Sequence, residues 1–390
     1  MFSPRVSHLV ESPTIGVADK ARALRQQGID VVDFGPGEPD FTTPRHIQEA
    51  GAQAILAGDT HYTPSRGTAA LRRAIAEKLE VDSGVGYDPD REVIVTASSK
   101  LALVVAALAL LGPGDEALLL TPAWVSYEAI VRLAEAVPVP VPLDGADNFQ
   151  ITRERLEPLV TPRTRVIFIN TPNNPTGRVY SRAELEAIAD VARRHDLIVV
   201  SDEIYEKIVF DGRAHLSIAA LPGMRARSVT LNGFSKGYAM TGWRLGYLAA
   251  DAPLVDELLK VQQHTIGCAA SFVQSAAVEA LRGTQAPVEE MRREYEARRD
   301  LVVAGLNSLP GVRCHVPEGT FYAFPSVAGC GFPSSTAFAE HMLQHARVAL
   351  TPGSAFGGPG EGHVRISFAT SREQIERGIG RLADALKAAV

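Results

Sequence analysis

The sequence predicts an α/β protein built around a mostly parallel sheet, and two observations lead to this fold class. Through the middle of the chain, short runs rich in Val and Ile alternate with helical patterns. Strands that are almost continuously apolar are typical of sheets covered by helices on both faces. Helix-length connections between such strands predict right-handed crossovers and therefore parallel neighbours.

Seven apolar runs are expected to form this sheet, at residues 92–96, 116–120, 137–141, 165–170, 197–201, 228–232 and 245–249. The helical patterns between them cover residues 100–111, 125–135, 182–195 and 254–264. Ser181 followed by Glu184 is the sequence pattern of a capping box, which marks the start of the third of these helices.

The pattern of predicted helices and strands changes after about residue 271. A long helix is expected over 271–308, broken near 283–287, followed by strands at 312–316, 320–324, 349–350 and 363–369 and helices at 335–345 and 372–389. This is the pattern of an α+β unit, and the segment before Pro44 also falls outside the alternating part. The sequence therefore predicts a large domain over residues 45–285 and a small domain formed by residues 1–44 and 286–390.

Composition and charge exclude several classes of function. The chain has 390 residues, and its 39 Lys and Arg against 45 Asp and Glu give a net charge of −6, which does not suit a general binder of nucleic acid or anionic membranes. The longest apolar run, Leu101–Leu111, is well short of the ~20 residues that cross a bilayer. The N-terminal residues have no signal-peptide layout, and the three cysteines have no disulfide or metal-site spacing. We expect a cytoplasmic protein with no metal.

The stretch Asn232–Gly246, NGFSKGYAMTGWRLG, is the most informative part of the sequence. Lys236 follows a predicted strand and lies among small residues, where partial desolvation would lower its pKa and free the amine for covalent chemistry. Arg244 lies eight residues further on and could bind a phosphate with two hydrogen bonds. Taken singly, Lys236 would more often be a solvated loop lysine, and Arg244 would more often be a surface arginine in an ion pair.

Two further motifs follow predicted strands. TPNNPTG begins after residue 170, and SDEIYE begins at residue 201. Open α/β sheets bind ligands at the carboxyl ends of their strands. A carboxylate held there, such as Asp202, can pair with a protonated pyridine nitrogen, and Tyr205 lies three residues away. An isolated motif of either kind would more often be a plain turn or a helix-capping Asp.

Together, and in this order, the three motifs resemble those of class I/II aminotransferases, the fold-type I pyridoxal-phosphate enzymes, in their aspartate aminotransferase-like branch. The small and apolar residues around Lys236 fit the family's attachment site, and GEPDF, PAWVSYEAIVR and HVRISFATS also fit this branch. The resemblance implies the PLP-transferase fold type I, with a large α/β domain and a smaller α+β domain formed by both termini.

The resemblance also implies how pyridoxal 5′-phosphate would be bound. Lys236 would hold it covalently, Asp202 would face its ring nitrogen, and Asn174 and Tyr205 would contact its ring oxygen. The remaining implied contacts are Ser98, Ser99, Trp124, Ser235, Arg244 and Tyr62. Relatives often carry a serine at the position of Gly233, so Ser235 and the 98–99 loop would have to replace its hydrogen bonds to the phosphate.

The implied role of Tyr62 requires a second subunit, because in relatives this tyrosine reaches the phosphate of the neighbouring chain. A homodimer is therefore expected, and the alternative is a monomer in which Tyr62 packs locally.

The implied activity is transfer of an amino group from an L-amino acid to a 2-oxo acid. Arg365, Asn174 and the backbone near Gly37 would bind the substrate α-carboxylate, and Lys236 would be the general base and acid, with Asp202 and Tyr205 as the other catalytic groups. The core motifs serve the cofactor, so a lyase, synthase or oxidase of the same fold is the alternative.

The choice of substrate depends on Lys100. It matches a lysine that recognises a distal carboxylate in some members of the branch, which favours aspartate or glutamate as donors with 2-oxoglutarate as acceptor. A solvated lysine in the first turn of a helix is the alternative, and aromatic or alanine-like donors stay open.

Overall fold

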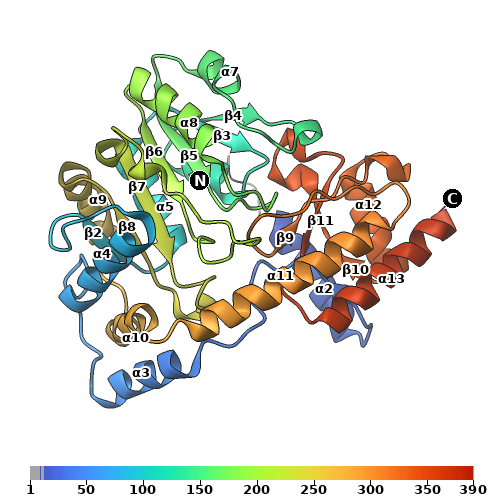
Figure 1. Ribbon diagram of the computed structural model, residues 1–390, viewed down its shortest axis with the longest axis horizontal. Helices are drawn as coiled ribbons and strands as arrows, with labels where there is room; N and C mark the ends of the chain where they lie inside the picture. Colours follow the sequence, from blue (N-terminus) through green and yellow to red (C-terminus); the bar gives the residue numbers. More distant parts are fainter. Residues whose placement is uncertain (1–8, 10–12, 390) are drawn as a thin grey trace, which may run out of the picture.

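The computed structural model describes residue 9 and residues 13–389, and a seven-stranded sheet lies at its centre (Figure 1). The strand order is β2-β8-β7-β6-β5-β3-β4. The strands are β2 Val93–Thr96, β3 Glu116–Thr121, β4 Val137–Pro142, β5 Thr164–Asn170, β6 Ile198–Asp202, β7 Ser228–Gly233 and β8 Gly246–Ala249. Strand β8 pairs with β2 and β7 in antiparallel fashion and every other pair in this sheet is parallel, so the predicted mostly parallel α/β architecture is confirmed.

Helices cover this part of the chain, and their bounds are α3 Arg45–Leu56, α4 Ala69–Ser83, α5 Ser99–Leu110, α6 Ser126–Leu133, α7 Arg153–Leu156, α8 Arg182–Arg194, α9 Ala252–Thr265 and α10 Ser271–Arg282. Successive strand residues point to opposite faces. Phe168 packs in a cluster with residues of α5, α6 and α9, whereas Ile167 packs with residues of α8. Burial on both faces is the reason that the strand sequences are almost continuously apolar.

The capping box at the start of α8 is present as the sequence predicts. The Ser181 hydroxyl accepts a hydrogen bond from the Glu184 N–H, and the Glu184 carboxylate accepts one from the Ser181 N–H. The two bonds satisfy N–H groups that a helix start leaves without partners. They fix the beginning of a helix that packs against the sheet next to the strand ends.

The remaining helices and strands come from both ends of the chain. The helices are α2 Pro13–Gln26, α11 Ala286–Asn307, α12 Ser335–His341 and α13 Arg372–Ala389, and the strands are β1 Val32–Asp33, β9 Tyr322–Ala323, β10 Val348–Ala349, β11 Thr351–Pro352 and β12 Val364–Ser367. Strand β1 pairs with β10 in parallel, and β11, β12 and β9 form an antiparallel sheet. In Figure 1 the long α11 joins the region of α10 to the C-terminal helices. The domain boundaries at 44/45 and 285/286 stay a prediction.

Short helical turns complete the chain. The 3-10 turns are 145–147, 157–159, 218–220, 225–227, 241–243, 328–330, 353–356 and 358–360, and Met342–Ala346 is a π-helical turn. The helix expected over 335–345 therefore ends as an α-helix at His341. No helix in the described part of the chain is long and apolar enough to span a membrane.

The strand predicted at 312–316 is wrong. Its backbone is partnered by a side chain instead of a neighbouring strand: the Asn307 amide donates to the Cys314 carbonyl at 3.0 Å, and its oxygen accepts from the Cys314 N–H at 2.8 Å. Arg313 makes only an isolated bridge with Ser326. Similarly, the strand expected at 320–324 is reduced to Tyr322–Ala323, and Thr320 at its start leaves the extended conformation with a positive φ of 64°.

Candidate active site

A cavity of about 740 Å³ opens at the carboxyl ends of the sheet strands. Every site residue expected from the sequence lines it except Tyr62: Gly37, Ser98, Ser99, Lys100, Trp124, Asn174, Asp202, Tyr205, Ser235, Lys236, Arg244 and Arg365. These residues come from loops that follow different strands and from both terminal segments. The cavity therefore assembles the three motifs in one place.

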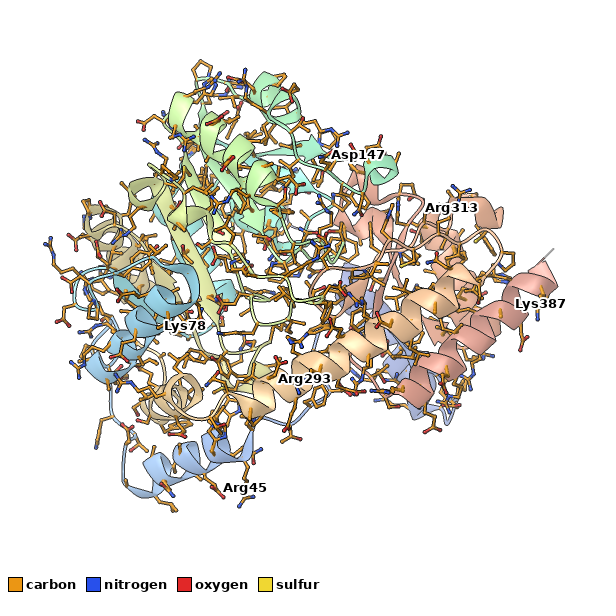
Figure 2. The ribbon with its side chains drawn as sticks, in the orientation of Figure 1. Arg45, Lys78, Asp147, Arg293, Arg313 and Lys387 are labelled. Atoms are coloured by element: carbon orange, nitrogen blue, oxygen red, sulfur yellow. The ribbon has the colours of Figure 1, made fainter. Side chains whose placement is uncertain are left out.

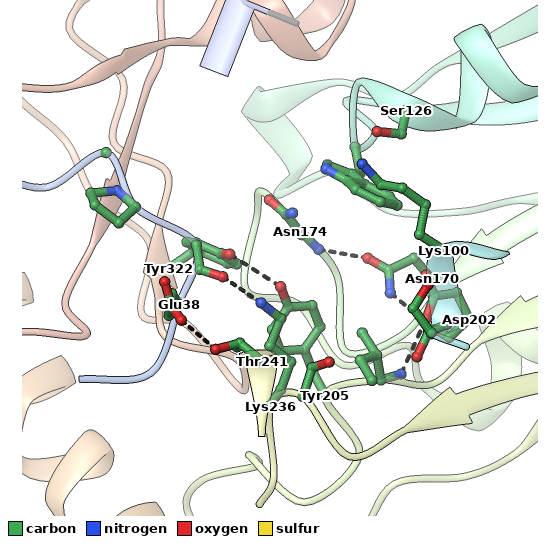
Figure 3. Close-up of a pocket in the computed structure, with 18 of the residues that line it drawn as sticks. Glu38, Lys100, Ser126, Asn170, Asn174, Asp202, Tyr205, Lys236, Thr241 and Tyr322 are labelled. Carbon is green, nitrogen blue, oxygen red and sulfur yellow. Dashed lines mark hydrogen bonds between the residues drawn. The ribbon is translucent and has the colours of Figure 1, made fainter. Parts of the chain in front are cut away.

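Lys236 lies three residues beyond the end of β7 and points into the cavity (Figure 3). Its amine donates a hydrogen bond to the Gly37 carbonyl. Burial lowers the pKa of Lys236 to about 8, and the nearby positive charges of Arg365 and Arg244 act in the same direction. A lysine with such a pKa has a substantial neutral fraction in mildly alkaline solution, as a nucleophile or a general base requires.

Asp202 is the last residue of β6 and is buried. Burial raises the pKa of this carboxyl to about 6, against the lowering effect of hydrogen bonds from the Tyr127 hydroxyl and the Ile204 N–H. Asn170 at the end of β5 donates its amide to the Asp202 carbonyl at 2.9 Å and accepts the Asn174 N–H at 2.8 Å. Asn170 therefore fixes the loop with Asn174 relative to the strand with Asp202.

The wall between α5 and β8 carries donors suited to an anion. Ser98 and Ser99 lie at the start of the twelve-residue helix α5, where backbone N–H groups favour phosphate, and Arg244 lines the same cavity. The Ser99 hydroxyl donates to the Asn232 carbonyl at 3.1 Å. A Cβ atom at Gly233 would overlap the Ser99 hydroxyl, so the glycine allows Ser99 to pack closely against this strand end.

Arg365 on β12 is a buried cation on the opposite side of the cavity. Its Nη1 donates to Asn174 Oδ1 at 3.1 Å, and its Nη2 donates to the Gly35 carbonyl at 2.7 Å. The Arg365 Nε is buried and has no hydrogen-bond partner among the described residues. A guanidinium buried without a carboxylate partner is costly, which indicates that an anionic ligand completes this site.

Tyr322 supports this cation and was missed by the sequence reasoning. The Arg365 guanidinium lies over the Tyr322 ring at 4.4 Å, and the Tyr322 hydroxyl is 3.1 Å from that of Tyr205 (Figure 3). A Cβ at Gly37 would overlap the same hydroxyl, so a glycine is required there. Tyr322 lies in GTFYAF, a short run without charged residues that gives no signal of a site.

Lys100 is the second residue of α5, and its amine lies 4.9 Å above the Trp124 ring. Burial lowers the pKa of Lys100, and the charge of Arg244 lowers it further. The side chain is thus partly withdrawn from water, as a recognition group would be, although cation–π contacts also occur on ordinary surfaces.

The loop that carries Asp202 and Tyr205 is anchored from behind. Glu203 pairs with His215 at 3.0 Å, and Glu206 pairs with Lys78 of α4, which is labelled in Figure 2. Neither glutamate lines the cavity. Burying these pairs fixes the loop, because removing one partner would leave an uncompensated charge inside the protein.

Comparison with known proteins identifies the family. The model of the aminotransferase class I and II family matches residues 29–382. The chain belongs to this family. It is 44% identical over 382 residues to an aspartate aminotransferase of Musicola paradisiaca, covering 98% of this chain and 96% of the relative. It is 45% identical over 364 residues to aromatic-amino-acid aminotransferase 2 of Thermococcus litoralis, covering 93% of each chain.

A solved aminotransferase structure agrees with the fold. Aspartate aminotransferase from Thermus thermophilus with maleate superposes with a TM-score of 0.94 at 39% identity, covering 99% of each chain. The aminotransferase described here therefore has the fold that the resemblance implied.

Proposed function

We propose that this aminotransferase binds pyridoxal 5′-phosphate through Lys236 and transfers the amino group of an acidic amino acid to a 2-oxo acid. The observation that carries the proposal is the shared cavity of Lys236 and Asp202, which combines a buried amine with a buried carboxyl. When bound, pyridoxal phosphate supplies an aldehyde that bonds to amines and a ring that accepts electrons from the substrate.

The residues present fit this cofactor. Lys236 would hold its aldehyde carbon, Asp202 would pair with its ring nitrogen, and Asn174 and Tyr205 would contact its ring oxygen. Burial raises the pKa of Tyr205 well above its usual value, so its hydroxyl stays protonated and able to donate. Its phosphate fits the N–H and hydroxyl donors at the start of α5 together with Ser235 and Arg244, and Trp124 offers a flat ring for stacking.

Side chains of the protein itself bind the substrate, transfer its proton and keep the cofactor ring protonated. Arg365 binds the substrate α-carboxylate with its planar guanidinium, assisted by Asn174 and the backbone near Gly37. Lys236 takes the proton from the substrate Cα as a general base and returns a proton as a general acid. Asp202 keeps the ring nitrogen protonated by presenting a negative charge to it.

The reaction class is tested by a donor panel. We expect aspartate or glutamate to convert the enzyme-bound cofactor to its amino form in single-turnover absorbance measurements, and 2-oxoglutarate or pyruvate to reverse the change. A lyase of the same fold would release product without accumulating that form. Failure of every donor in the panel to produce the reversible change would overturn the proposal.

An acidic donor is favoured by Lys100 and by the relatives. Lys100 could pair with the distal carboxylate of such a substrate, and the Thermus thermophilus relative was solved with maleate, a dicarboxylate. The Thermococcus litoralis relative is named for aromatic amino acids, so an aromatic donor is the second candidate.

Replacing Lys100 with alanine separates the two candidates. We expect Lys100→Ala to reduce kcat/KM for aspartate and glutamate by roughly 10- to 100-fold, as loss of a charged hydrogen bond does, and to leave aromatic donors nearly unchanged. Steady-state rates over the donor panel give the measurement, with the exposed Lys260→Ala as matched control. An equal reduction for all donors would rule out a role in side-chain recognition.

We also propose a homodimer. Tyr62 is 98% exposed and does not line the cavity of its own chain, and Leu56 on α3 is 86% exposed. Leu56, its neighbour Ile55 and Tyr62 lie close together in the sequence, and a group of exposed apolar side chains is typical of an interface, whereas a single one such as Val81 is ordinary. In the dimer, Tyr62 would reach the phosphate of the cofactor in the partner subunit.

The dimer is checked by sedimentation velocity at low micromolar concentration. We expect the wild-type protein to sediment as a dimer and Leu56→Asp to raise the dimer dissociation constant at least about tenfold, because a charge would be buried. Val81→Asp changes a similarly exposed valine on α4 and serves as control. A wild-type monomer under these conditions would exclude the role of Tyr62.

A further inference from the structure

Tyr127, the second residue of α6, directs its hydroxyl at the carboxylate that ends β6. The hydroxyl donates a hydrogen bond of 2.7 Å to Asp202 Oδ2, and the Ile204 N–H donates one of 3.2 Å to Asp202 Oδ1. Rotation of the carboxylate about its Cβ–Cγ bond would weaken both. The two donors therefore fix the plane of the Asp202 carboxylate, and one of them is a side chain.

Packing holds the Tyr127 ring in this direction. The ring makes an edge-to-face contact with Trp124 at a centroid distance of 5.5 Å and lies 6.1 Å from Phe168 of β5. The Tyr127 N–H donates to the Trp124 carbonyl at 3.0 Å, and the side chain is buried. Aromatic contacts on two sides orient the hydroxyl without a further hydrogen bond.

The Tyr127 hydroxyl stays protonated around neutral pH and therefore donates its hydrogen bond to Asp202. Burial raises its pKa well above the usual value, and the negative charge of Asp202 acts in the same direction. The phenols of Tyr205 and Tyr180, which also face it, disfavour its ionised form as well. The proton of the hydroxyl therefore stays on Tyr127 and is shared with Asp202.

The Asp202 carboxyl is under opposing influences. Its pKa is raised to about 6, chiefly by burial and to a lesser degree by the charge of Glu203. The hydrogen bonds from Tyr127 and Ile204 lower the pKa, as does the charge of Lys236. Tyr127 supplies the first of the lowering influences, so its loss leaves the ionised form less stable.

We propose that Tyr127 is a positioning residue that fixes the Asp202 carboxylate, through this one hydrogen bond, as the partner of the cofactor's ring nitrogen. The inference rests on the proposed function, since that function places the ring nitrogen at Asp202. Tyr127 acts through Asp202 and has no role in proton transfer to the substrate.

The test is the affinity for pyridoxamine phosphate, which forms no covalent bond with Lys236 and so isolates the ring contacts. The dissociation constant is measured by equilibrium dialysis on the enzyme in its pyridoxamine phosphate form, between pH 5 and pH 9. Binding should weaken as the pH falls through the pKa of Asp202, because protonation removes the charge that pairs with the ring nitrogen. Tyr127→Phe should raise the dissociation constant about tenfold at pH 7 and move the acid limb upward by about one pH unit.

A matched control removes a hydroxyl elsewhere. Tyr295→Phe alters a buried tyrosine of α11 that does not line the cavity, and it should follow the wild type. In an Asp202→Asn background, adding Tyr127→Phe should change the dissociation constant less than about twofold, because a residue that acts only through Asp202 has no further effect once that charge is gone.

The outcomes distinguish this inference from the proposed function. Equal binding by Tyr127→Phe and Tyr295→Phe, or additive effects in the double variant, would overturn the role of Tyr127 alone. A wild-type protein that does not bind pyridoxamine phosphate at all would overturn both.

Discussion

Replacing Lys236 with alanine should abolish repeated turnover and covalent attachment of the cofactor. The variant lacks both the amine that bonds to the cofactor and the base at the substrate Cα, so we expect kcat to fall by roughly 10⁴-fold or more. Borohydride reduction followed by peptide mass spectrometry should find the reduced cofactor on Lys236 in the wild type and on no lysine in the variant.

This variant should still fold. The pKa of Lys236 is lowered by burial, so the charged amine is less stable in the folded protein than in water, and its removal should not lower the Tm of the cofactor-free protein. The exposed Lys260→Ala is the control and should keep both turnover and labelling. Turnover by Lys236→Ala within tenfold of the wild type would disprove the assignment of the reactive amine.

Replacing Arg365 with lysine should impair every amino acid donor. Lysine keeps the charge but loses the planar fork that reaches Asn174, Gly35 and a carboxylate at once. We expect kcat/KM to fall by roughly 100- to 1,000-fold, which corresponds to about 3–4 kcal/mol of lost transition-state binding. Steady-state kinetics over the donor panel measure the loss.

Two comparisons make the result specific. A primary amine without an α-carboxylate should react equally slowly with the wild type and with Arg365→Lys, because neither can use the missing contact. Arg313→Lys changes an exposed arginine (Figure 2) and should behave as the wild type. A loss confined to dicarboxylic donors would instead place Arg365 at the distal carboxylate.

Several of the residues that the sequence could predict lie in motifs that follow strands. Asp202 and Lys236 each come after an apolar run that predicts a strand, which places them at one edge of the sheet, and the resemblance of the ordered motifs to class I/II aminotransferases implied their roles. The relation is local, so it can be recognised without knowing how the strands are ordered.

The residues that escaped prediction act across long separations in the chain. Tyr322 meets Tyr205 over 117 positions, and Tyr127 meets Asp202 over 75. Each is an aromatic residue in an apolar setting, and only the packing of the terminal segments and of α6 shows that its hydroxyl faces the site. The helix α3 was not predicted either, since it buries only Ile47 and Gly51 and shows no continuous apolar face.

The run from Asp202 to Glu206 alternates between two tasks. Asp202 and Tyr205 line the cavity, whereas Glu203 and Glu206 are held by His215 and Lys78 behind it. A screen that scored only product formation would count the two glutamates among the reacting groups, although neither lines the cavity. A library that varies residues 202–206 should therefore yield few improved variants, because a substitution at a cavity position disturbs the chemistry and a substitution of either glutamate loosens the loop that holds the cavity residues.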